Sequence, residues 1–299
     1  MPLQEIFRPS ILRVPAYGSE VHSWHGHIPF AFWSIDALRP RIFVELGCHR
    51  GDSYLAFCQA VDELSAATRC YAVDTWQGDE HAGRYGDEVY EELRRQHDPR
   101  YGRFSRLVRT TFDQARDQFA EGSVDLLHID GYHEYGVVQH DFESWLSRMS
   151  ARGVILLHDI NVRQEGFGVW RLWEELRGAY PSFAFLHSHG LGVLAVGREV
   201  PDAVGALAGL DQEGRREVED LFARLGEAVR YDLENRRLRA ALAERQAEVA
   251  RLQGQVADLS GLTDRLQQAV EETRRSTSWK ITQPLRLLRH LVRRSRSQG

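Results

Sequence analysis

Short apolar runs that alternate with amphipathic stretches dominate the first two thirds of the chain. The apolar runs predict buried strands, and the stretches between them predict helices, for example over residues 87–97 and 137–149. The predicted strands are residues 42–46, 70–74, 105–109, 124–130, 154–158, 184–187 and 192–197. Strands that are apolar throughout and alternate with helices are typical of a parallel sheet covered on both faces. We therefore expect an α/β fold with a Rossmann-like, doubly wound sheet.

The last two predicted strands differ from the others because only a short turn separates them. Residues 183–187 and 191–196 flank a turn that contains His and Gly. A connection this short joins antiparallel strands, whereas a parallel crossover needs a dozen or more residues. The sequence therefore predicts an antiparallel hairpin at one edge of the sheet.

The pattern changes near residue 200, where strand signals end and Ala, Arg, Glu, Gln and Leu dominate. We expect residues 1–199 to form the globular domain and residues 200–227 to form a helical linker. From Tyr231 onward, mostly apolar positions recur at alternating spacings of three and four. This heptad pattern predicts a helical coiled-coil extension over residues 228–275 and a homo-oligomer formed through it.

The register of this coiled coil has one clear marker. Asn235 at a core position favours a single register and a parallel dimer. Arg245 and Thr263 also occupy core positions, and they leave dimer and trimer both open. The alternative is a single helix that is solvated or packed on the globular part.

Residues 276–299 form a distinct basic segment, with no acidic residue after Glu272. Leu285, Leu288 and Leu291 fall on one helical face, and Trp279 precedes them. A basic amphipathic helix of this kind is typical of contact with an anionic membrane surface or an acidic partner. A frayed tail, or a helix packed on a protein, is the alternative.

The overall composition excludes some classes of protein. With 299 residues and a net charge of −5, the chain has no global basic field, so we expect no nucleic-acid partner. No run approaches the roughly 18 apolar residues of a membrane span. The first residues lack the pattern of a signal peptide. The three cysteines, Cys48, Cys58 and Cys70, lack metal-type spacing, which favours reduced thiols and a cytoplasmic location.

The first candidate site is the glycine-containing turn between the first predicted strand and the following helix. Its residues Glu45, Gly47, Gly51 and Ser53 are the candidate cofactor-binding residues. Glycine lets the backbone approach a ligand closely, and a helix N-terminus offers unpaired N–H groups. A carboxylate on the strand argues against a bound phosphate. It favours a cationic, zwitterionic cofactor such as S-adenosylmethionine.

Asp74 ends the second predicted strand and extends this site. An acid at that position can accept hydrogen bonds from both ribose hydroxyls of a nucleoside. Trp76 follows two residues later and is placed to cover the adenosine. The alternative for Asp74 is a turn or capping residue.

A second candidate site follows the fourth and fifth predicted strands, which end at Asp130 and at His158 and Asp159. Because ligands bind at the carboxyl ends of parallel strands, these side chains should converge beside the cofactor. Asp130, His158 and Asp159 suit a divalent ion such as Mg²⁺ or Mn²⁺, which would lower the pKa of a substrate hydroxyl. His133 suits a general base, so we expect His133 and Asp130 to be catalytic. The alternatives are a metal-free polar cluster in which one acid is the base, and a loop histidine at 133 bonded to the backbone.

Together, these residues resemble the class I S-adenosylmethionine-dependent methyltransferases. The pattern His-Ile-Asp-Gly-x-His-x-Tyr at residues 128–135, followed by Gly-Val-x-x-x-His-Asp at 153–159, is similar to one subgroup. That subgroup contains macrocin-type sugar O-methyltransferases and the cephalosporin hydroxylase group. Residues 24–31 and 166–170 also resemble it, so the resemblance spans roughly residues 18–197.

The resemblance implies a role for several residues. Glu45 and Gly47 would line the methionine end of the cofactor, and Asp74 would bind its ribose. Asp130 and Asp159 would bind a metal ion. Relatives often carry an acid where this chain has His158, and this departure bears on the metal site.

The resemblance also implies a function: O-methyl transfer to a sugar hydroxyl of a bacterial surface polysaccharide or a glycolipid precursor. Residues 276–299 would then contact the inner membrane peripherally, or a glycosyltransferase. One alternative is a coiled-coil scaffold of a glycan-assembly complex whose globular domain binds the cofactor without turnover. Another is a hydroxylase that uses iron and 2-oxoglutarate, although no two-His, one-carboxylate spacing is evident.

Overall fold

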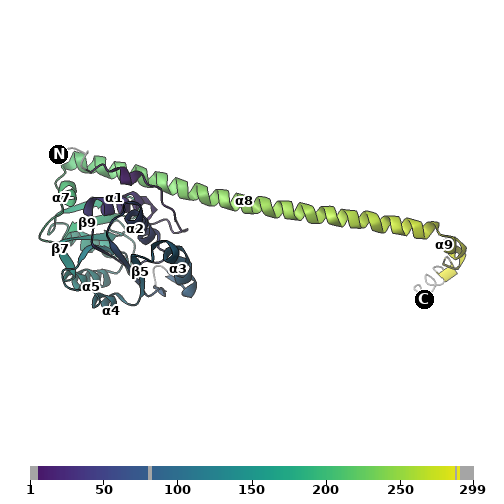
Figure 1. Cartoon of the computed structure of the whole chain (residues 1–299), viewed down its shortest axis with the longest axis horizontal. Helices are drawn as coiled ribbons and strands as arrows, with labels where there is room; N and C mark the ends of the chain where they lie inside the picture. Colours follow the sequence, from purple (N-terminus) through teal and green to yellow (C-terminus); the bar gives the residue numbers. More distant parts are fainter. Residues whose placement is uncertain (1–5, 80–82, 287, 290–299) are drawn as a thin grey trace. The chain divides into compact units, whose positions relative to one another are not determined.

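The computed structural model describes residues 6–79, 83–286 and 288–289 of the chain. It divides into two compact units, Met1–Glu234 and Asn235–Gly299, which we call unit 1 and unit 2 and describe separately. Figure 1 shows the whole chain coloured along the sequence.

Unit 1 is built on a mixed sheet of seven strands in the order β5-β2-β1-β6-β7-β9-β8. The five strands from β5 to β7 are parallel, and β9 pairs antiparallel with both β7 and β8. The strands are β1 (Ile42–Leu46), β2 (Arg69–Asp74), β5 (Ser105–Arg109), β6 (Val124–Ile129), β7 (Met149–His158), β8 (Ser182–Phe185) and β9 (Leu191–Ala195). A separate antiparallel pair joins β3 (Gly78–Asp79) and β4 (Gly83–Arg84). The expected α/β sheet and its antiparallel edge hairpin are therefore confirmed.

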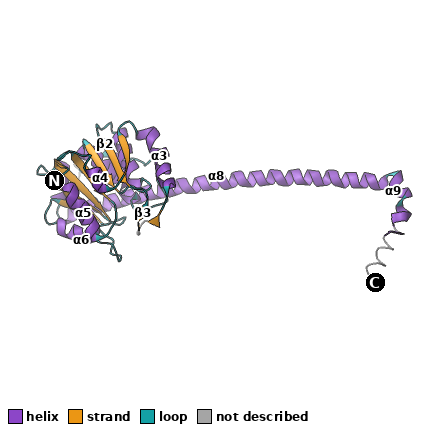
Figure 2. Cartoon of the chain, turned by 90° about the horizontal axis from the view of Figure 1, so that it is seen from below, coloured by secondary structure: helices purple, strands orange, loops and turns teal. Residues whose placement is uncertain are grey.

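Helices cover both faces of this sheet, as Figure 2 shows. Unit 1 contains η2 (Pro9–Leu12), η3 (His25–His27), α1 (Ile28–Leu38), α2 (Asp52–Glu63), α3 (Asp87–Tyr101), α4 (Phe112–Arg116), α5 (Tyr135–Leu146), α6 (Val169–Leu176) and α7 (Asp202–Ala208). One core cluster joins the sheet to α1, α2, α3 and α7, and a second joins it to α4, α5 and α6. These two layers explain why the central strands are apolar on both faces.

The long helix α8 (Gln212–Arg275) begins in unit 1 and continues into unit 2. Its first turns bury Val218, Phe222 and Val229 in the core that contains α1 and α2. Residues 212–227, which we expected as part of a helical linker, therefore pack as a helix of the globular unit.

Unit 2 consists of the remainder of α8 and the short helix α9 (Thr277–Ile281). Ser276 caps α9 by accepting a hydrogen bond from the Trp279 N–H, and the Arg286 guanidinium lies 3.6 Å from the Trp279 ring centroid. Of the predicted basic segment at 276–299, residues 287 and 290–299 lie outside the described residues. Among the helices that the structure describes, none has an apolar stretch long enough to cross a membrane.

Candidate active site

The turn after β1 is held in a conformation that requires glycine. Gly47 has φ 85°, and a Cβ added there would lie 2.1 Å from the Asp130 carbonyl oxygen. Gly51 also has φ 85° and forms the N-cap of α2 without a side-chain cap. Glycine is needed at Gly47 both for its dihedral angle and because the chain after β6 passes so close.

Asp74, at the end of β2, fixes this turn in place. Its Oδ2 accepts hydrogen bonds from the N–H groups of Cys48 and His49, each at 2.9 Å. Its Oδ1 accepts from the Trp76 N–H at 2.7 Å. Asp74 thus joins the ends of β1 and β2, and it also lines the cleft described next.

A cleft of about 560 Å³ opens at the carboxyl ends of the parallel strands. Its wall takes Gly47 from the turn after β1, Asp74 from β2, Asp130 from the loop after β6, and His158 and Asp159 from the end of β7. Four neighbouring strands therefore contribute to one cleft, as expected for an open parallel sheet.

Most of the residues that the sequence singled out lie on this cleft. The members of that set that line it are Gly47, Ser53, Asp74, Asp130, His133, His158 and Asp159. Glu45, Gly51 and Trp76 do not line it. Each of these three instead supports a residue or a turn that does.

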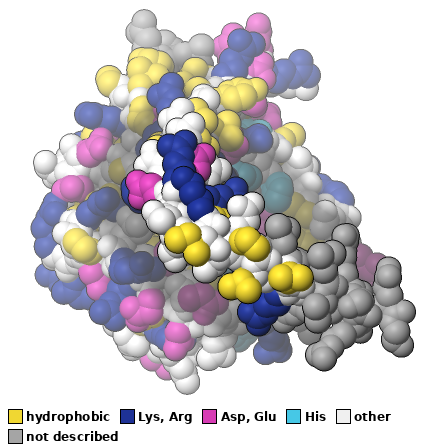
Figure 3. All heavy atoms as spheres, turned by 90° about the vertical axis from the view of Figure 1, so that its right-hand side faces the viewer, with side chains coloured by type: hydrophobic (Ala, Val, Ile, Leu, Met, Phe, Trp, Pro, Cys, Tyr) yellow, Lys and Arg dark blue, Asp and Glu magenta, His cyan; other side chains and the backbone are white. Residues whose placement is uncertain are grey.

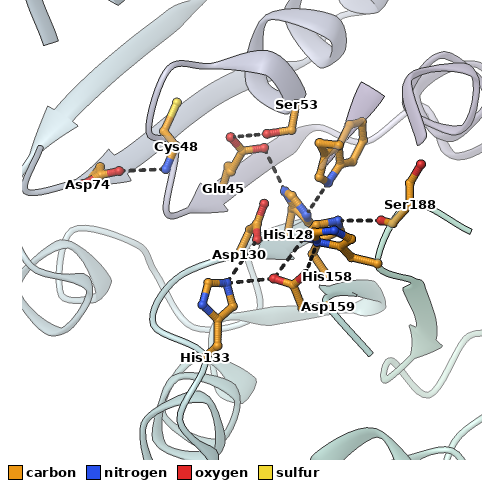
Figure 4. A network of polar contacts seen from close by, with 12 residues as sticks. Glu45, Cys48, Ser53, Asp74, His128, Asp130, His133, His158, Asp159 and Ser188 are labelled. Carbon is orange, nitrogen blue, oxygen red and sulfur yellow. Dashed lines mark hydrogen bonds and ion pairs between the residues drawn. The ribbon is translucent and has the colours of Figure 1, made fainter. Parts of the chain in front are cut away.

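Glu45 lies fully buried behind the cleft in a chain of hydrogen bonds (Figure 4). Its Oε1 accepts from Ser53 Oγ at 2.9 Å, and its Oε2 is 2.8 Å from His128 Nδ1. Because Trp24 Nε1–H donates to His128 Nε2 at 3.1 Å, the histidine proton lies on Nδ1 and points at Glu45. Burial raises the pKa of Glu45. The carboxylate thus positions Ser53 and Trp24, the two members of the chain that face the cleft.

Trp76 is also buried rather than placed against the cleft. Its φ is 50°, its ring lies 4.8 Å from that of Tyr90, and its Nε1 donates to the His49 carbonyl at 2.9 Å. The indole therefore anchors the glycine turn from behind.

A cluster of two acids and two histidines forms the other end of the cleft (Figure 4). His133 Nε2 lies 2.8 Å from Asp159 Oδ2. His158 Nδ1 lies 3.1 Å from Asp130 Oδ1 and 3.3 Å from Asp159 Oδ2. Asp159 adopts φ 61°, a left-handed conformation that is uncommon for any residue other than glycine. Strained residues of this kind cluster at functional sites.

The surroundings of His158 make it a cation. Its Nε2 faces the Ser188 carbonyl oxygen at 3.2 Å, and that oxygen can only accept a hydrogen bond. Its Nδ1 faces two carboxylates, so both ring nitrogens donate. Burial alone would lower the pKa of His158, but the charges of Asp130 and Asp159 raise it well above its ordinary value.

This geometry bears on the expected metal ligands Asp130, His158 and Asp159. With both ring nitrogens donating, His158 has no lone pair to offer an ion. Asp130, His133 and Asp159 instead bring one ligand atom each to within 4.8 Å of one another. His133 thus lies where we had expected the ring of His158.

His133 itself is held from two sides. Its ring stacks on Phe167, with centroids 4.6 Å apart and planes at 14°. Burial would lower its pKa, but the hydrogen bond and the charge of Asp159, together with Asp130, outweigh burial and raise it. A histidine whose orientation and proton affinity are both set by a carboxylate is suited to accept a proton.

Trp24 and Phe167 are among the side chains that line the cleft and had no role assigned from the sequence. Trp24 precedes η3, and Phe167 lies in the loop before α6. Both lie in the segments, residues 24–31 and 166–170, that resemble the methyltransferase subgroup in sequence. Their positions relative to the strand ends did not indicate this role, because Trp24 precedes every strand of the sheet and Phe167 lies far along the loop that joins β7 to α6.

Part of the chain is similar in sequence to known proteins. Residues 44–160, from β1 to just past β7, match the sequence model of a family described as a methyltransferase domain. The chain is 45% identical over 251 residues to the uncharacterized protein y4gI of Sinorhizobium fredii. That alignment covers 81% of this chain and 28% of y4gI, so the chain spans under a third of the length of this relative.

Solved structures of methyltransferases show a distant likeness. The SAH-bound methyltransferase PaMTH1 of Podospora anserina is 14% identical, with a TM-score of 0.43 over 56% of this chain and 76% of that one. The O-methyltransferase TomG of Streptomyces achromogenes, in complex with SAM, is 12% identical, with a TM-score of 0.44 over 60% and 91%.

Proposed function

We propose that this chain is an S-adenosylmethionine-dependent O-methyltransferase that acts on a sugar hydroxyl of a surface polysaccharide or glycolipid precursor. One observation carries the proposal. A single cleft has a glycine turn tied to Asp74 at one end and the His133–Asp159 pair at the other. The match of residues 44–160 to a methyltransferase domain supports the same class.

The cofactor would lie at the end formed by the glycine turn. Asp74 would accept from the ribose hydroxyls with the lone pairs that its backbone contacts do not use. The N-terminus of α2 has no side-chain cap, because its N-cap residue is Gly51. The carboxylate of the first helical residue, Asp52, is bonded to Ser19 and His25. The first N–H groups of α2 would therefore face the cofactor's carboxylate. When bound, S-adenosylmethionine supplies a methyl group made electrophilic by a positive sulfur.

The acceptor hydroxyl would lie beside His133. Asp159 accepts from Nε2 of His133, so the hydroxyl proton would go to Nδ1 of the same ring. Stacking on Phe167 fixes the orientation of the His133 ring, and Asp159 would stabilise the imidazolium that forms. The hydroxyl oxygen would then be able to attack the methyl carbon, the bond between that carbon and the sulfur would break, and S-adenosylhomocysteine would leave.

The carboxylates also fit a divalent ion in donor type and spacing. Asp130 and Asp159 would hold Mg²⁺ or Mn²⁺ through their oxygens, and such an ion would lower the pKa of the acceptor hydroxyl. His158 would remain as the buried cation that orients both carboxylates.

The choice of a sugar rests on the sequence pattern at residues 128–159 and on the lining of the acceptor end. Trp24 and Phe167 offer aromatic surface there, and Ser23 and His189 offer polar atoms. Aromatic faces beside polar groups are what the C–H face and the hydroxyls of a pyranose contact.

The test is formation of S-adenosylhomocysteine by the full chain, measured by mass spectrometry. S-adenosylmethionine would be supplied with a panel of free sugars, nucleotide sugars and bacterial glycolipid extracts. We expect turnover with at least one saccharide. Binding of the cofactor without turnover on any acceptor would contradict the proposal and favour a non-catalytic scaffold.

The metal is tested in the same assay. We expect EDTA to lower the rate at least tenfold and Mn²⁺ or Mg²⁺ to restore it. Asp130→Asn should be inactive, whereas Asp113→Asn, which changes a carboxylate outside the cleft, should behave as the wild type. A rate that EDTA leaves unchanged would overturn the metal part and leave the His133–Asp159 pair to act alone.

A further inference from the structure

Helix α8 exposes a regular apolar stripe in unit 2. The stripe consists of Leu238, Leu242, Val249, Leu252, Val256, Leu259, Leu266 and Val270. Their exposed fractions run from 46% at Leu252 to 66% at Val256. Figure 3, which views the molecule from the right-hand side of Figure 1, shows hydrophobic side chains at the surface of the face that it draws. An exposed run of this length is a binding surface for another helix rather than a solvated face.

The spacing of the stripe defines its partner geometry. Counted from Asn235 as position a of a heptad, the a positions are Leu242, Val249, Val256, Thr263 and Val270. Leu fills the d positions at 238, 252, 259 and 266. Four of these five a residues are β-branched and most d residues are Leu, a combination that favours two parallel strands.

The flanking positions indicate that the partner is a copy of the same chain. The e and g positions carry mainly Gln, Ala and Ser, for example Gln246, Gln253 and Gln255. The charged residues Arg237, Glu244, Arg251, Asp258, Arg265 and Glu272 occupy the outward c positions instead. A different partner would be selected by complementary e and g charges, and this helix has few of them: Glu234 and Glu248 at g, and Arg239 and Arg274 at e. An identical helix meets no like-charge contact across the e and g positions.

We propose that residues 228–270 bind a second copy of this chain as a parallel, in-register, two-stranded coiled coil. Asn235 then faces Asn235 of the copy, a pairing that specifies register. In an antiparallel pair, the a positions of one chain would face the d positions of the other. Arg239 of one chain would then lie near Arg274 of the other at each end, and these like charges would repel. Arg245 is the one charged d residue of the stripe, and its long stem lets the guanidinium reach solvent.

The a and d positions of the stripe continue back into the part of α8 that belongs to unit 1. There the buried side chains Val218, Phe222 and Val229 occupy b and e positions. Ala228 and Tyr231, at the next a and d positions, are exposed, Tyr231 by 63%. From residue 228 onward, the core of unit 1 therefore uses a different face of this helix and leaves the a and d face open, whereas Leu221, at an earlier a position, packs against that core.

The oligomeric state of the full chain tests the proposal by light scattering after size exclusion. We expect the mass of two copies for the wild type. Leu252→Asp with Leu259→Asp should weaken the dimer at least 100-fold and give monomer at micromolar concentration. Ala250→Asp with Ala257→Asp, which places the same charges at outward b positions, should remain dimeric. A wild-type monomer or trimer, or a dimer that Leu252→Asp with Leu259→Asp leaves intact, would overturn the proposal.

Disulfide trapping tests the orientation. Leu238→Cys and Leu266→Cys, made singly, should each give a covalent dimer on mild oxidation, because like d positions face each other only in a parallel, in-register pair. The native cysteines are buried and serve as the background. Cross-linking that requires Leu238→Cys and Val270→Cys in the same chain would indicate an antiparallel pair and contradict the proposal. Neither experiment depends on methyl transfer, so the two proposals can fail separately.

Discussion

Unit 1 and the part of α8 in unit 2 use the same residue types in opposite ways. In unit 1 the large apolar side chains are buried in two clusters, and polar groups are gathered at one cleft. In unit 2 the apolar side chains are exposed, and most of the charged residues lie outside the apolar stripe. Unit 1 buries its apolar side chains within its own fold, whereas the stripe of unit 2 is exposed and is the surface that we propose binds a second helix.

This contrast shows where sequence changes should matter. Unit 1 holds residues in conformations that only its packing permits, such as Gly47 and Asp159 with positive φ. Local helix propensity and the apolar stripe dominate in the helix of unit 2. The same kind of substitution should therefore have different consequences in the two regions.

The largest expected effect is on catalysis and is confined to unit 1. His133→Ala should lower kcat by about 10²- to 10⁴-fold, the usual contribution of a general base. His140→Ala, which removes an exposed histidine of α5 that contacts Asp113, should stay within about twofold of the wild type. Both variants should keep the mass of the wild type in light scattering. A His133→Ala enzyme with full kcat would show that the base is another residue.

A buried acid of unit 1 should make stability depend on pH. Burial raises the pKa of Asp141 to about 7, and its Oδ2 has no hydrogen-bond partner among the described residues. In an unfolded chain the pKa is about 3.9, so the folded state binds this proton more tightly. The resulting stability is full below about pH 4 and is lost as the pH rises through about 7.

Asp141→Asn should remove this dependence. We expect the variant to gain up to about 4 kcal/mol in free energy of unfolding over the wild type near pH 8, and little near pH 4. Urea titrations at several pH values measure the difference. Asp264→Asn, at an exposed site in unit 2, should follow the wild-type profile. A parallel shift of the Asp141→Asn curve at every pH would contradict the assignment.

Glycine-to-alanine substitutions should have opposite signs in the two regions. At Gly47 the added Cβ would lie 2.1 Å from a backbone oxygen at φ 85°, so Gly47→Ala should cost at least about 2 kcal/mol. At Gly254 nothing lies within 4 Å, so Gly254→Ala should stabilise α8 by about 0.5–1 kcal/mol per chain. Thermal unfolding followed by circular dichroism checks both. Equal changes in stability for Gly47→Ala and Gly254→Ala would contradict the difference between the two units.

The sheet was predictable because its strands are continuous apolar runs with turn signals between them. The cleft followed in large part, since parallel strands end at one edge and Gly47, Asp74, Asp130 and Asp159 all follow strands. The packing of residues 212–234 on the core was not predicted. Residues 200–227 were predicted to be a helical linker because helix-forming residues dominate there, and only the contacts of Val218 and Phe222 show that this helix packs on the core.

The roles of individual side chains were less predictable than their neighbourhood. Glu45 and Trp76 were expected against the cofactor, but hydrogen bonds to Ser53, His128 and His49 place them behind the cleft. His158 donates a hydrogen bond from its second ring nitrogen to the Ser188 carbonyl, which is 30 residues away in sequence. Such contacts depend on loop conformation, which no periodic pattern encodes.

Titration of S-adenosylmethionine into the purified full chain by calorimetry tests the account most directly. Asp74→Asn is the paired variant, because its amide oxygen can still accept from the backbone N–H groups that Asp74 holds. We predict micromolar binding to the wild type and affinity weaker by about 10- to 100-fold in the variant, the loss of a hydrogen bond to a charged group. Absence of binding to the wild type, with or without Mn²⁺, would contradict the assignment of the cleft as a cofactor site.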